Sequence, residues 1–312
     1  MGVCRSSCEI PVGGAGRGSY FTVYGVDDDI QINAAIVAAK NSTISKTVRI
    51  NSETYHTSAP IILYPDVRVV FNNCIIKPDS DISCIKNYDQ LVTTSNYYLD
   101  GVLEIDGTNV VTATNNLIEF IRADNVQSSA KIYAHDSGAR VFYMQGCKNG
   151  QVAHVYGDTT HDVVYIYASC SQINVYSMTS LRSISDGLDI RSSEGISVTN
   201  CNVSLSQRHG ALLMSTNRCY VQGVFFNNNQ ENIAEYNGIS LNKAAGGAES
   251  KNNIIDAICY DDQASPTQSY GLKFTADTAD NNYLIRGTGN VIGLTCDLGT
   301  NNAPLRLNGT SG

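Results

Sequence analysis

The fold is decided by one repeated stretch, which reads Ser185-Asp186-Gly187-Leu188-Asp189-Ile190. Its pattern of polar corner, small residue and apolar run recurs along the chain, in His161-Asp162-Val163-Val164-Tyr165-Ile166, Arg208-His209-Gly210-Ala211-Leu212-Leu213, Tyr236-Asn237-Gly238-Ile239-Ser240-Leu241, Ser269-Tyr270-Gly271-Leu272-Lys273-Phe274 and Ala303-Pro304-Leu305-Arg306-Leu307. Asp162 lies 24 residues before Asp186, and His209 lies 23 residues after it. A period of about two dozen residues indicates a repeat architecture.

The repeat unit predicts one turn of a parallel β-solenoid. Each unit holds a short strand, a bend, a second strand and a return, whereas a propeller blade needs about 40 or more residues. Alternation along a strand predicts that Leu188 and Ile190 point inward while Asp189 and Arg191 point outward into solvent. Turns of a parallel sheet repeat every ~4.8 Å, so we expect equivalent residues to form columns.

The N-terminal part of the chain differs from the repeats. Residues 1–19 are rich in Gly, Ser and Arg and are expected to form a flexible arm. Asp27-Asp28-Asp29 then precedes an apolar stripe, which predicts a helix over about 28–40; the stripe is Ile30, Ile32, Ala35, Ile36 and Ala39. Short β-rich runs follow this helix, at Thr47–Ile50, Ile61–Tyr64, Val67–Phe71 and Ile75–Lys77. We therefore expect a single all-β domain over residues 20–312.

Composition excludes several classes of protein. The chain has 312 residues, a formal charge of −8 and 16% charged residues, against about 25% in ordinary domains. Intrinsic disorder is excluded because it needs high charge and low hydrophobicity. A membrane-spanning helix is not expected, because no stretch reaches the roughly 18 apolar residues that it needs. The sequence has no cluster of Lys and Arg of the kind that binds a nucleic acid. Its first residues lack the apolar segment of a signal peptide.

Cysteines and acidic turns give no strong indication of a metal. Cysteines in apolar runs are expected to be reduced and buried: these are Cys170, Cys201, Cys219, Cys259 and Cys296. Cys4 and Cys8 cannot complete a zinc site by themselves. Asp261-Asp262-Gln263 offers oxygen ligands of the kind that calcium takes, but a turn is the simpler interpretation. No cofactor is expected.

The N-terminal lead-in adds a resemblance to the repeats. Tyr24-Gly25-Val26-Asp27-Asp28-Asp29 before an Ile/Ala helix, followed by strands and then the repeats, resembles the pectin-lyase-like superfamily of right-handed parallel β-helices. The resemblance implies a right-handed β-helix whose N-terminal end is capped by the helix. The superfamily holds hydrolases, lyases, epimerases and phage tailspikes. It therefore implies a polysaccharide partner, action outside the cell or on a virion and, for a tailspike, a homotrimer.

Stacking predicts a column that contains Asp162, Asp186 and His209. Cleavage of a glycosidic bond needs one carboxylic acid and one carboxylate, and residues on neighbouring turns can supply both. Asp186 lies between the other two, so repulsion should raise its pKa and make it the acid, with Asp162 as the ionised base. His209 would orient the pair or bind sugar hydroxyls.

The order of these residues resembles that of the polygalacturonases. Thr160-His161-Asp162, Ser185-Asp186 and Arg208-His209-Gly210 stand where that family has Asn-Thr-Asp, Asp-Asp and Gly-His-Gly. Ser185 replaces one carboxylate, and Ser240-Leu241-Asn242-Lys243 lacks the arginine of the fourth motif. The mannuronan C5-epimerases carry Asp-Arg-His-Gly at a similar segment, but here Gln207 precedes Arg208. His209 is common to both comparisons.

Two interpretations of the column remain open. In the first, the chain cleaves or modifies a polysaccharide, as a hydrolase or as a polyuronate lyase or C5-epimerase. The residues expected to bind its substrate are Arg208, Asp189, Arg191, Tyr165, Tyr167 and Lys243. In the second, the corner residues only form a hydrogen-bonded ladder, and the chain is a noncatalytic adhesin or tailspike. Open, well-separated carboxylates favour the first, and a buried, fully paired column favours the second.

Overall fold

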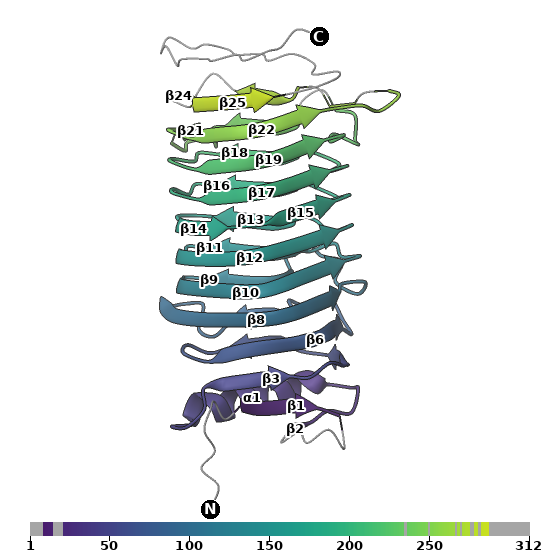
Figure 1. The fold of residues 1–312 in the computed structure, drawn as a ribbon, viewed down its shortest axis with the longest axis vertical. Helices are drawn as coiled ribbons and strands as arrows, with labels where there is room; N and C mark the ends of the chain where they lie inside the picture. Colours follow the sequence, from purple (N-terminus) through teal and green to yellow (C-terminus); the bar gives the residue numbers. More distant parts are fainter. Residues whose placement is uncertain are drawn as a thin grey trace, which may run out of the picture.

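The chain is built almost entirely from parallel strands. The computed structural model describes residues 9–14, 21–233, 236–248, 250–265, 267–268, 270–274, 278–279 and 282–286. Figure 1 shows their strands stacked like rungs along one long axis, with a single helix at the N-terminal end. Within these residues, no helix has the length and apolar character needed to cross a bilayer.

Sheet A is the larger sheet of the described part and has 14 parallel strands. They are β1 (Glu9–Gly13), β2 (Phe21–Thr22), β3 (Thr47–Ile50), β4 (Thr54–Thr57), β6 (Arg68–Pro78), β8 (Thr94–Asp106), β10 (Ala123–His135), β12 (Lys148–Asp158), β14 (Ser171–Val175), β15 (Met178–Leu181), β17 (Ser197–Ser204), β19 (Tyr220–Phe226), β22 (Ile254–Tyr260) and β25 (Asn282–Arg286).

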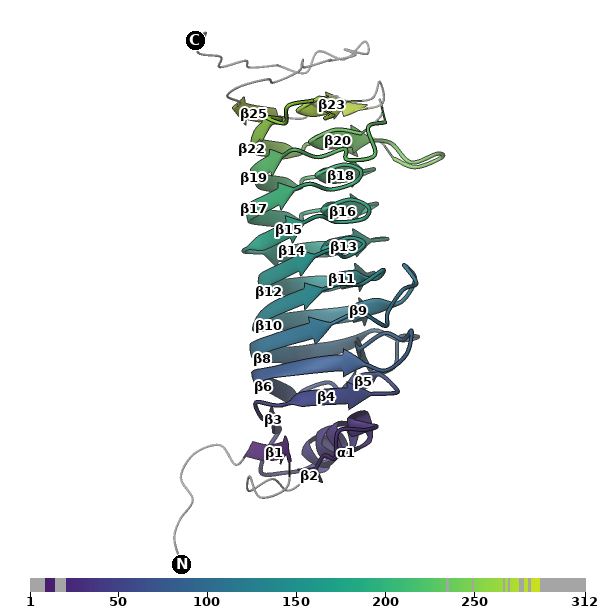
Figure 2. The ribbon, with the colours of Figure 1, turned by 90° about the vertical axis from the view of Figure 1, so that its right-hand side faces the viewer.

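Sheet B has nine parallel strands among the same residues and faces sheet A across the core (Figure 2). They are β5 (Ile61–Leu63), β7 (Ile85–Asn87), β9 (Asn116–Ile121), β11 (Arg140–Gln145), β13 (Val164–Tyr167), β16 (Leu188–Arg191), β18 (Ala211–Met214), β20 (Ile239–Asn242) and β23 (Leu272–Phe274). A small pair joins β21 (Ser250–Lys251) to β24 (Thr278–Ala279).

The register confirms the predicted solenoid. Leu188 pairs with Val164 on one neighbouring turn and with Ala211 on the other, and Ile239 and Leu272 continue the same row. Leu188 and Ile190 are fully buried between the sheets, as expected. The predicted right-handed parallel β-helix is therefore correct. The final repeat, at residues 303–307, lies outside the described residues.

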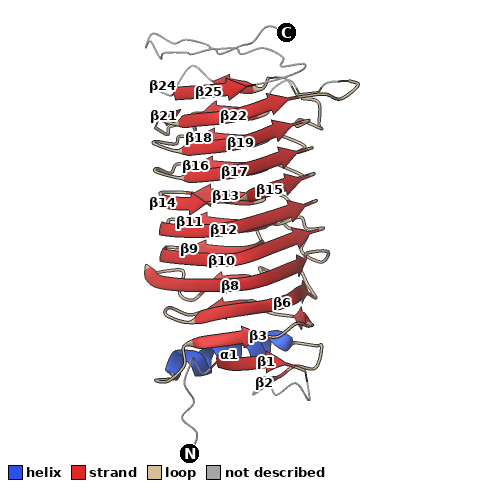
Figure 3. Ribbon diagram, in the orientation of Figure 1, coloured by secondary structure: helices blue, strands red, loops and turns tan. Residues whose placement is uncertain are grey.

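Helix α1 (Asp28–Asn41) covers the N-terminal end of the core, as predicted (Figure 3). Ile32 and Ile36 are fully buried, whereas Ile30 is exposed and does not belong to the buried stripe. The first-turn acids bind the β-helix: Asp28 Oδ2 accepts the His56 N–H at 2.9 Å, and Asp29 Oδ1 accepts the Ser58 N–H at 2.8 Å. These contacts fix the helix on the first turn.

The flexible arm expected over residues 1–19 is wrong for its middle part. Residues Glu9–Gly13 form β1, which pairs in parallel with β3 and with β2. Arg49 of β3 forms an ion pair with Glu9, and Val12 is fully buried. The Gly- and Ser-rich composition of residues 1–19 hid this strand, because its apolar part is only the three residues Ile10, Pro11 and Val12. Residues 1–8 and 15–19 lie outside the residues that the structure describes.

Asp261 organises a turn rather than an open ligand site. Its Oδ2 accepts the backbone N–H groups of Thr267 at 2.7 Å and Gln268 at 2.8 Å, and its side chain is buried. The backbone of Asp262 in turn donates to Asn227 Oδ1 at 3.0 Å. The structure therefore agrees with the turn interpretation of this segment.

The described cysteines are reduced and buried in the core, which includes the predicted Cys170, Cys201, Cys219 and Cys259. Three more occupy similar interior positions, namely Cys74, Cys84 and Cys147. Cys4, Cys8 and Cys296 lie outside the description. Burial raises the pKa of Cys74 to about 12 and that of Cys259 to about 12, so both thiols stay protonated and inert.

Thiol titration checks this arrangement. We expect a water-soluble thiol reagent to leave the seven described cysteines unmodified in the native protein and to modify all of them after unfolding in guanidinium. Equal counts before and after unfolding would contradict it, because the interior cysteines would then be accessible or already oxidised.

Candidate active site at the corner column

The corner before sheet B carries one polar residue per turn. The register of sheet B places these residues in a single column, and in chain order they are Asn116, Arg140, Asp162, Asp186, His209 and Asn237. The structure thus brings together Asp162, Asp186 and His209, which were predicted from the repeat. All three are nearly inaccessible, with 1%, 2% and 7% of their surface exposed.

A hydrogen-bonded ladder links these turns. The Asp186 N–H donates to Asp162 Oδ1 at 3.0 Å, and the His209 N–H donates to Asp186 Oδ1 at 2.9 Å. The Asn237 N–H then donates to His209 Nδ1 at 3.0 Å. Each corner side chain therefore accepts the amide of the next corner, which satisfies a backbone group that would otherwise be buried without a partner.

The second oxygen of Asp162 is held by two basic side chains. Asp162 Oδ2 lies 2.9 Å from His161 Nδ1 and 3.1 Å from Arg140 Nε. Burial alone would raise the pKa of Asp162, but the His161 hydrogen bond and the charges of His161 and Arg140 hold it below its usual range. Asp162 is therefore a carboxylate at neutral pH.

Asp186 has the opposite electrostatic environment. Burial raises its pKa well above the usual value, and the neighbouring charges of Asp189 and Asp162 raise it further. No cation contacts its carboxyl group among the described residues. Asp186 therefore holds its proton to a higher pH than an ordinary carboxyl group does. Such pairs, whose pKa values diverge, mark acid and base assignments.

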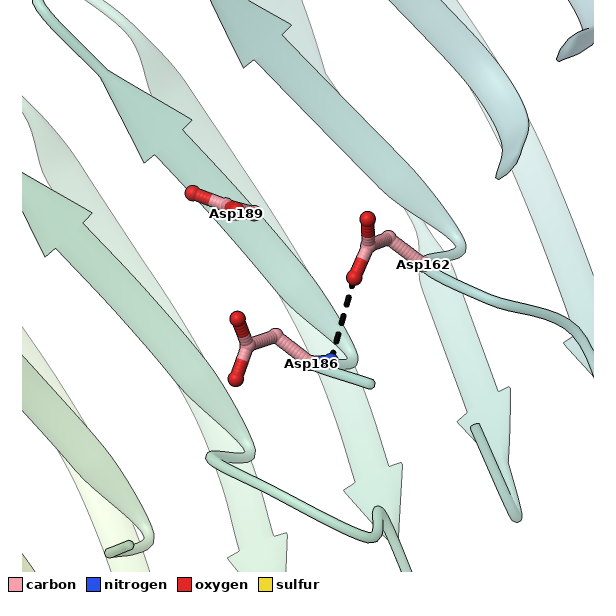
Figure 4. A group of neighbouring side chains, drawn as sticks. All are labelled: Asp162, Asp186 and Asp189. Carbon is pink, nitrogen blue, oxygen red and sulfur yellow. Dashed lines mark hydrogen bonds between the residues drawn. The ribbon is translucent and has the colours of Figure 1, made fainter. Parts of the chain in front are cut away.

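Asp189 joins these two residues to form a cluster of three carboxyl groups (Figure 4). One oxygen from each lies within 4.8 Å of the others. Burial raises the pKa of Asp189 to about 7, although the hydrogen bond from Arg191 opposes that change. A divalent cation could bridge three ionised carboxylates at this spacing, but the raised pKa of Asp186 works against such a site.

The predicted solvent exposure of Asp189 is wrong. Its side chain projects from the outer face of β16, as alternation predicts, but only 1% of the residue is exposed. Arg191 folds back along the strand, and its Nε lies 2.8 Å from Asp189 Oδ1 and 2.9 Å from Oδ2. The Arg191 side chain itself remains 34% exposed. Asp189 is thus an ion-paired member of the cluster rather than a solvated surface residue.

Tyrosines pack beside the cluster on the outer face of sheet B. Tyr165 is enclosed, since the guanidinium carbons of Arg140 and Arg191 lie 4.4 and 5.4 Å from its ring centre. Tyr167 stacks on Tyr165 at 5.7 Å and is 37% exposed. Tyr167 therefore offers a flat surface to a ligand, and the expectation that Tyr165 does so is wrong because the two arginines cover it.

His209 and Arg208 lie one turn beyond the acids. Burial, together with the charges of nearby cations, lowers the pKa of His209 to about 4. Its ring is neutral, and because Nδ1 accepts the Asn237 amide, Nε2 carries the proton. Arg208 is exposed and lies over the ring of Tyr236, 5.8 Å from its centre, and 3.8 Å from a carboxylate oxygen of Glu231.

Lys243 does not belong to this site. It follows β20, whose residue Asn242 pairs with Met214, and Met214 pairs with Arg191. This register places Lys243 past the far end of the strand, whereas the carboxyl cluster lies at the near end. The expected role of Lys243 in substrate binding therefore has no geometric support.

Sequence reasoning missed Arg140 and gave His161 no role. Arg140 precedes Phe142 by two residues, as Asp162 precedes Val164, so the repeat could have placed it in the column. His161 was adjacent to a predicted residue, but a strand-like alternation would point it away from Asp162. The left-handed backbone at Thr159, with φ 54°, marks the turn that departs from this alternation.

No family model matches the sequence, and no curated protein matches it. Among solved structures, the Azotobacter vinelandii mannuronan C-5 epimerase AlgE6 A-module is similar, with a TM-score of 0.52, 14% identity, and coverage of 89% of this chain and 94% of that one. The chain has the right-handed parallel β-helix fold.

Two further β-helix structures resemble the chain less closely. The AlgE4 A-module from the same bacterium has a TM-score of 0.44 and 13% identity, covering 91% of this chain and 98% of its own. The Dettilon tailspike protein has a TM-score of 0.40 and 12% identity, covering 83% of this chain and 65% of its own. At these identities the likeness concerns the β-helix fold alone.

Two isosteric variants separate the structural contributions of the acids. Asp162→Asn removes the carboxylate that pairs with Arg140 and His161, and we expect it to lower the free energy of unfolding by roughly 3 kcal/mol, as for other buried pairs. Asp186→Asn replaces a carboxyl group whose raised pKa favours the neutral form, and it keeps an oxygen for the His209 N–H. At pH 7 it should be at least as stable as the parent.

The pH dependence of Asp186→Asn follows from the raised pKa. The folded parent holds a proton that the unfolded chain releases above about pH 3.9, so the parent loses stability as pH rises from there through the folded pKa. An amide at this position avoids the loss, and the advantage of the variant should shrink towards pH 4. Denaturant titrations at several pH values measure it. A loss at pH 7 equal to that of Asp162→Asn would contradict the assignment.

Proposed function

We propose that the outer face of sheet B binds a polysaccharide and modifies it by acid–base chemistry at Asp162 and Asp186. The observation that carries the proposal is the divergence of the two pKa values within one hydrogen-bonded column. Asp186 would donate a proton and Asp162 would accept one. A pair poised in this way supplies both steps of a proton-transfer reaction at neutral pH.

The spacing of the carboxyl groups bears on the reaction class. Oxygens of Asp162 and Asp186 approach within 4.8 Å, whereas inverting glycosidases keep their carboxyl groups about 6.5–9.5 Å apart to admit a water. The inverting, polygalacturonase-like reaction is therefore disfavoured. Proton abstraction from a sugar ring, as in a lyase or an epimerase, needs no such gap and is the version that we propose.

The cationic side chains at the rim of the carboxyl cluster suit an acidic sugar. Arg140, His161 and Arg191 cover the carboxyl groups, and their side chains are 19%, 24% and 34% exposed. Arg208 adds a further exposed cation one turn away. Guanidinium groups bind sugar carboxylates through paired hydrogen bonds. The similar fold is that of a module that acts on mannuronan, so polyuronates are the first substrates to test.

A second function is favoured by the burial of the column. Asp162 and Asp186 each accept a backbone amide, as structural corner residues do, and little of either is exposed. In this alternative the cations and Tyr167 bind a polysaccharide without changing it, as in an adhesin or tailspike. Catalysis requires that the substrate displace Arg140 and His161, whereas binding does not.

A panel of polysaccharides tests the proposal, with polymannuronate and polygalacturonate at its head. New reducing ends report hydrolysis, ultraviolet absorbance reports elimination, and exchange of the C5 proton in heavy water, followed by NMR, reports epimerisation. Asp186→Asn should lower turnover by about 10²–10⁴-fold, the usual contribution of general acid–base groups. The matched control is Asp256→Asn on sheet A, which should retain full activity.

The outcomes discriminate between the two functions. Full activity of Asp186→Asn would remove this residue from the mechanism. Binding of a polyuronate without any of the three reaction products would favour the adhesin. In that case Arg191→Gln should weaken binding, since it removes an exposed cation from the rim.

A further inference from the structure

The outer face of sheet A carries a groove, on the other side of the β-helix from the carboxyl cluster. It encloses about 310 Å³ over β6, β8, β10 and β12. Figure 2 shows the strands of sheets A and B along opposite sides of the stack. The groove shares no lining residue with the site on sheet B, so a function here is separate from the proposed reaction.

Strand pairing is irregular beside the groove. The register shifts between Ser128 and Lys131 in β10, where Ser128 and Ser129 line the groove, and such a shift bends a strand. A second shift lies further along β6, between Asn72 and Cys74. Gly101 lies at the bend with φ 92°, and a Cβ there would lie 2.0 Å from the carbonyl oxygen of Phe71. Strands can approach at this point only because the residue is glycine.

Two tyrosines lie at the groove. Tyr98 projects from β8 and is partly exposed, with the guanidinium carbon of Arg68 5.6 Å from its ring centre. Tyr176 follows β14 and is 47% exposed. Flat aromatic faces bearing a polar tip suit a ligand that has both apolar and hydroxyl-bearing surfaces.

Amide side chains lie between the two tyrosines. Tyr98 pairs with Gln127, and Gln127 pairs with Gln151, so one column carries them on consecutive turns. Gln127 Nε2 donates to Asn125 Oδ1 at 2.8 Å, which leaves its carbonyl oxygen to accept. The exposed Gln151 side chain makes no hydrogen bond within the described residues and can both donate and accept.

The charges of the groove cancel. Arg68 and Asp100 are the charged residues of its lining, and Arg68 Nη1 lies 2.9 Å from Asp100 Oδ2. Ser129 also donates a hydrogen bond to Asp100. This neutral lining contrasts with the exposed arginines of sheet B. It gives no advantage to an anionic ligand, and the amides give none to a purely apolar one.

We propose that this groove binds a neutral oligosaccharide, stacked on Tyr98 and Tyr176 and hydrogen-bonded by Gln127 and Gln151. The three residues of the column span two intervals of ~4.8 Å, so the ligand is longer than a single sugar ring. Planar amides that accept and donate match the adjacent hydroxyl groups of a pyranose. The groove therefore gives the protein a second carbohydrate contact, independent of chemistry at sheet B.

Calorimetric titration of the full chain tests the proposal with three neutral probes: cellohexaose, maltohexaose and mannohexaose. At least one should bind saturably, with a Kd of about 1 mM or tighter. Tyr176→Ala should weaken that binding at least tenfold and Gln151→Ala severalfold. Both residues are exposed, so neither variant should alter the thermal unfolding midpoint, which is the check that each remains folded.

Two controls locate the binding. Tyr220 continues the Tyr98 column in β19, well beyond the groove, so Tyr220→Ala should bind as the parent does. Asp186→Asn should also bind normally, because it changes only sheet B. The proposal is overturned if none of the three probes binds, if Tyr220→Ala weakens binding as much as Tyr176→Ala does, or if binding is lost in Asp186→Asn.

Discussion

The structure depends on the hydrogen bonding of each turn to the next. In a parallel β-helix the amides of the strands find their partners on neighbouring turns, and at the corners the regular ladder of the sheets is interrupted. Asp162, Asp186 and His209 supply the missing acceptors, because each side chain accepts a hydrogen bond from the amide of the following corner. The repeat of about two dozen residues exists because this correspondence must be kept from turn to turn.

The same constraint generates the unusual electrostatics. Stacking places like residues in a column, so two acids on consecutive corners must lie close together in a buried site. Arg140 and His161 stabilise the charge of Asp162, while Asp186 lies beside Asp189 without a cation of its own, so burial and the neighbouring acids raise its pKa. A structural role and a chemical role are therefore compatible: one oxygen of each acid holds the fold, and the proton of Asp186 is available because of where the fold places it.

Much of this arrangement could be predicted from the sequence. The spacing of Asp162, Asp186 and His209 placed them in one column, and the central position of Asp186 indicated its raised pKa. The burial of Asp189 could not be predicted, because it results from Arg191 folding back along the strand. Tyr165 is covered by Arg140 from the preceding turn, which alternation within one strand does not reveal. The groove on sheet A was also hidden, since the register shift after Ser128 depends on pairing between strands.

The proposed chemistry requires Asp186 to be a neutral carboxylic acid in the folded protein while Asp162 is ionised. Infrared difference spectroscopy between the parent chain and Asp186→Asn, recorded near neutral pH, measures this directly. The parent should show a carbonyl band of a protonated carboxyl group that is absent from Asp186→Asn, and Asp162→Asn should lose no such band. Loss of only a carboxylate band in Asp186→Asn would contradict it, because Asp186 would then be ionised.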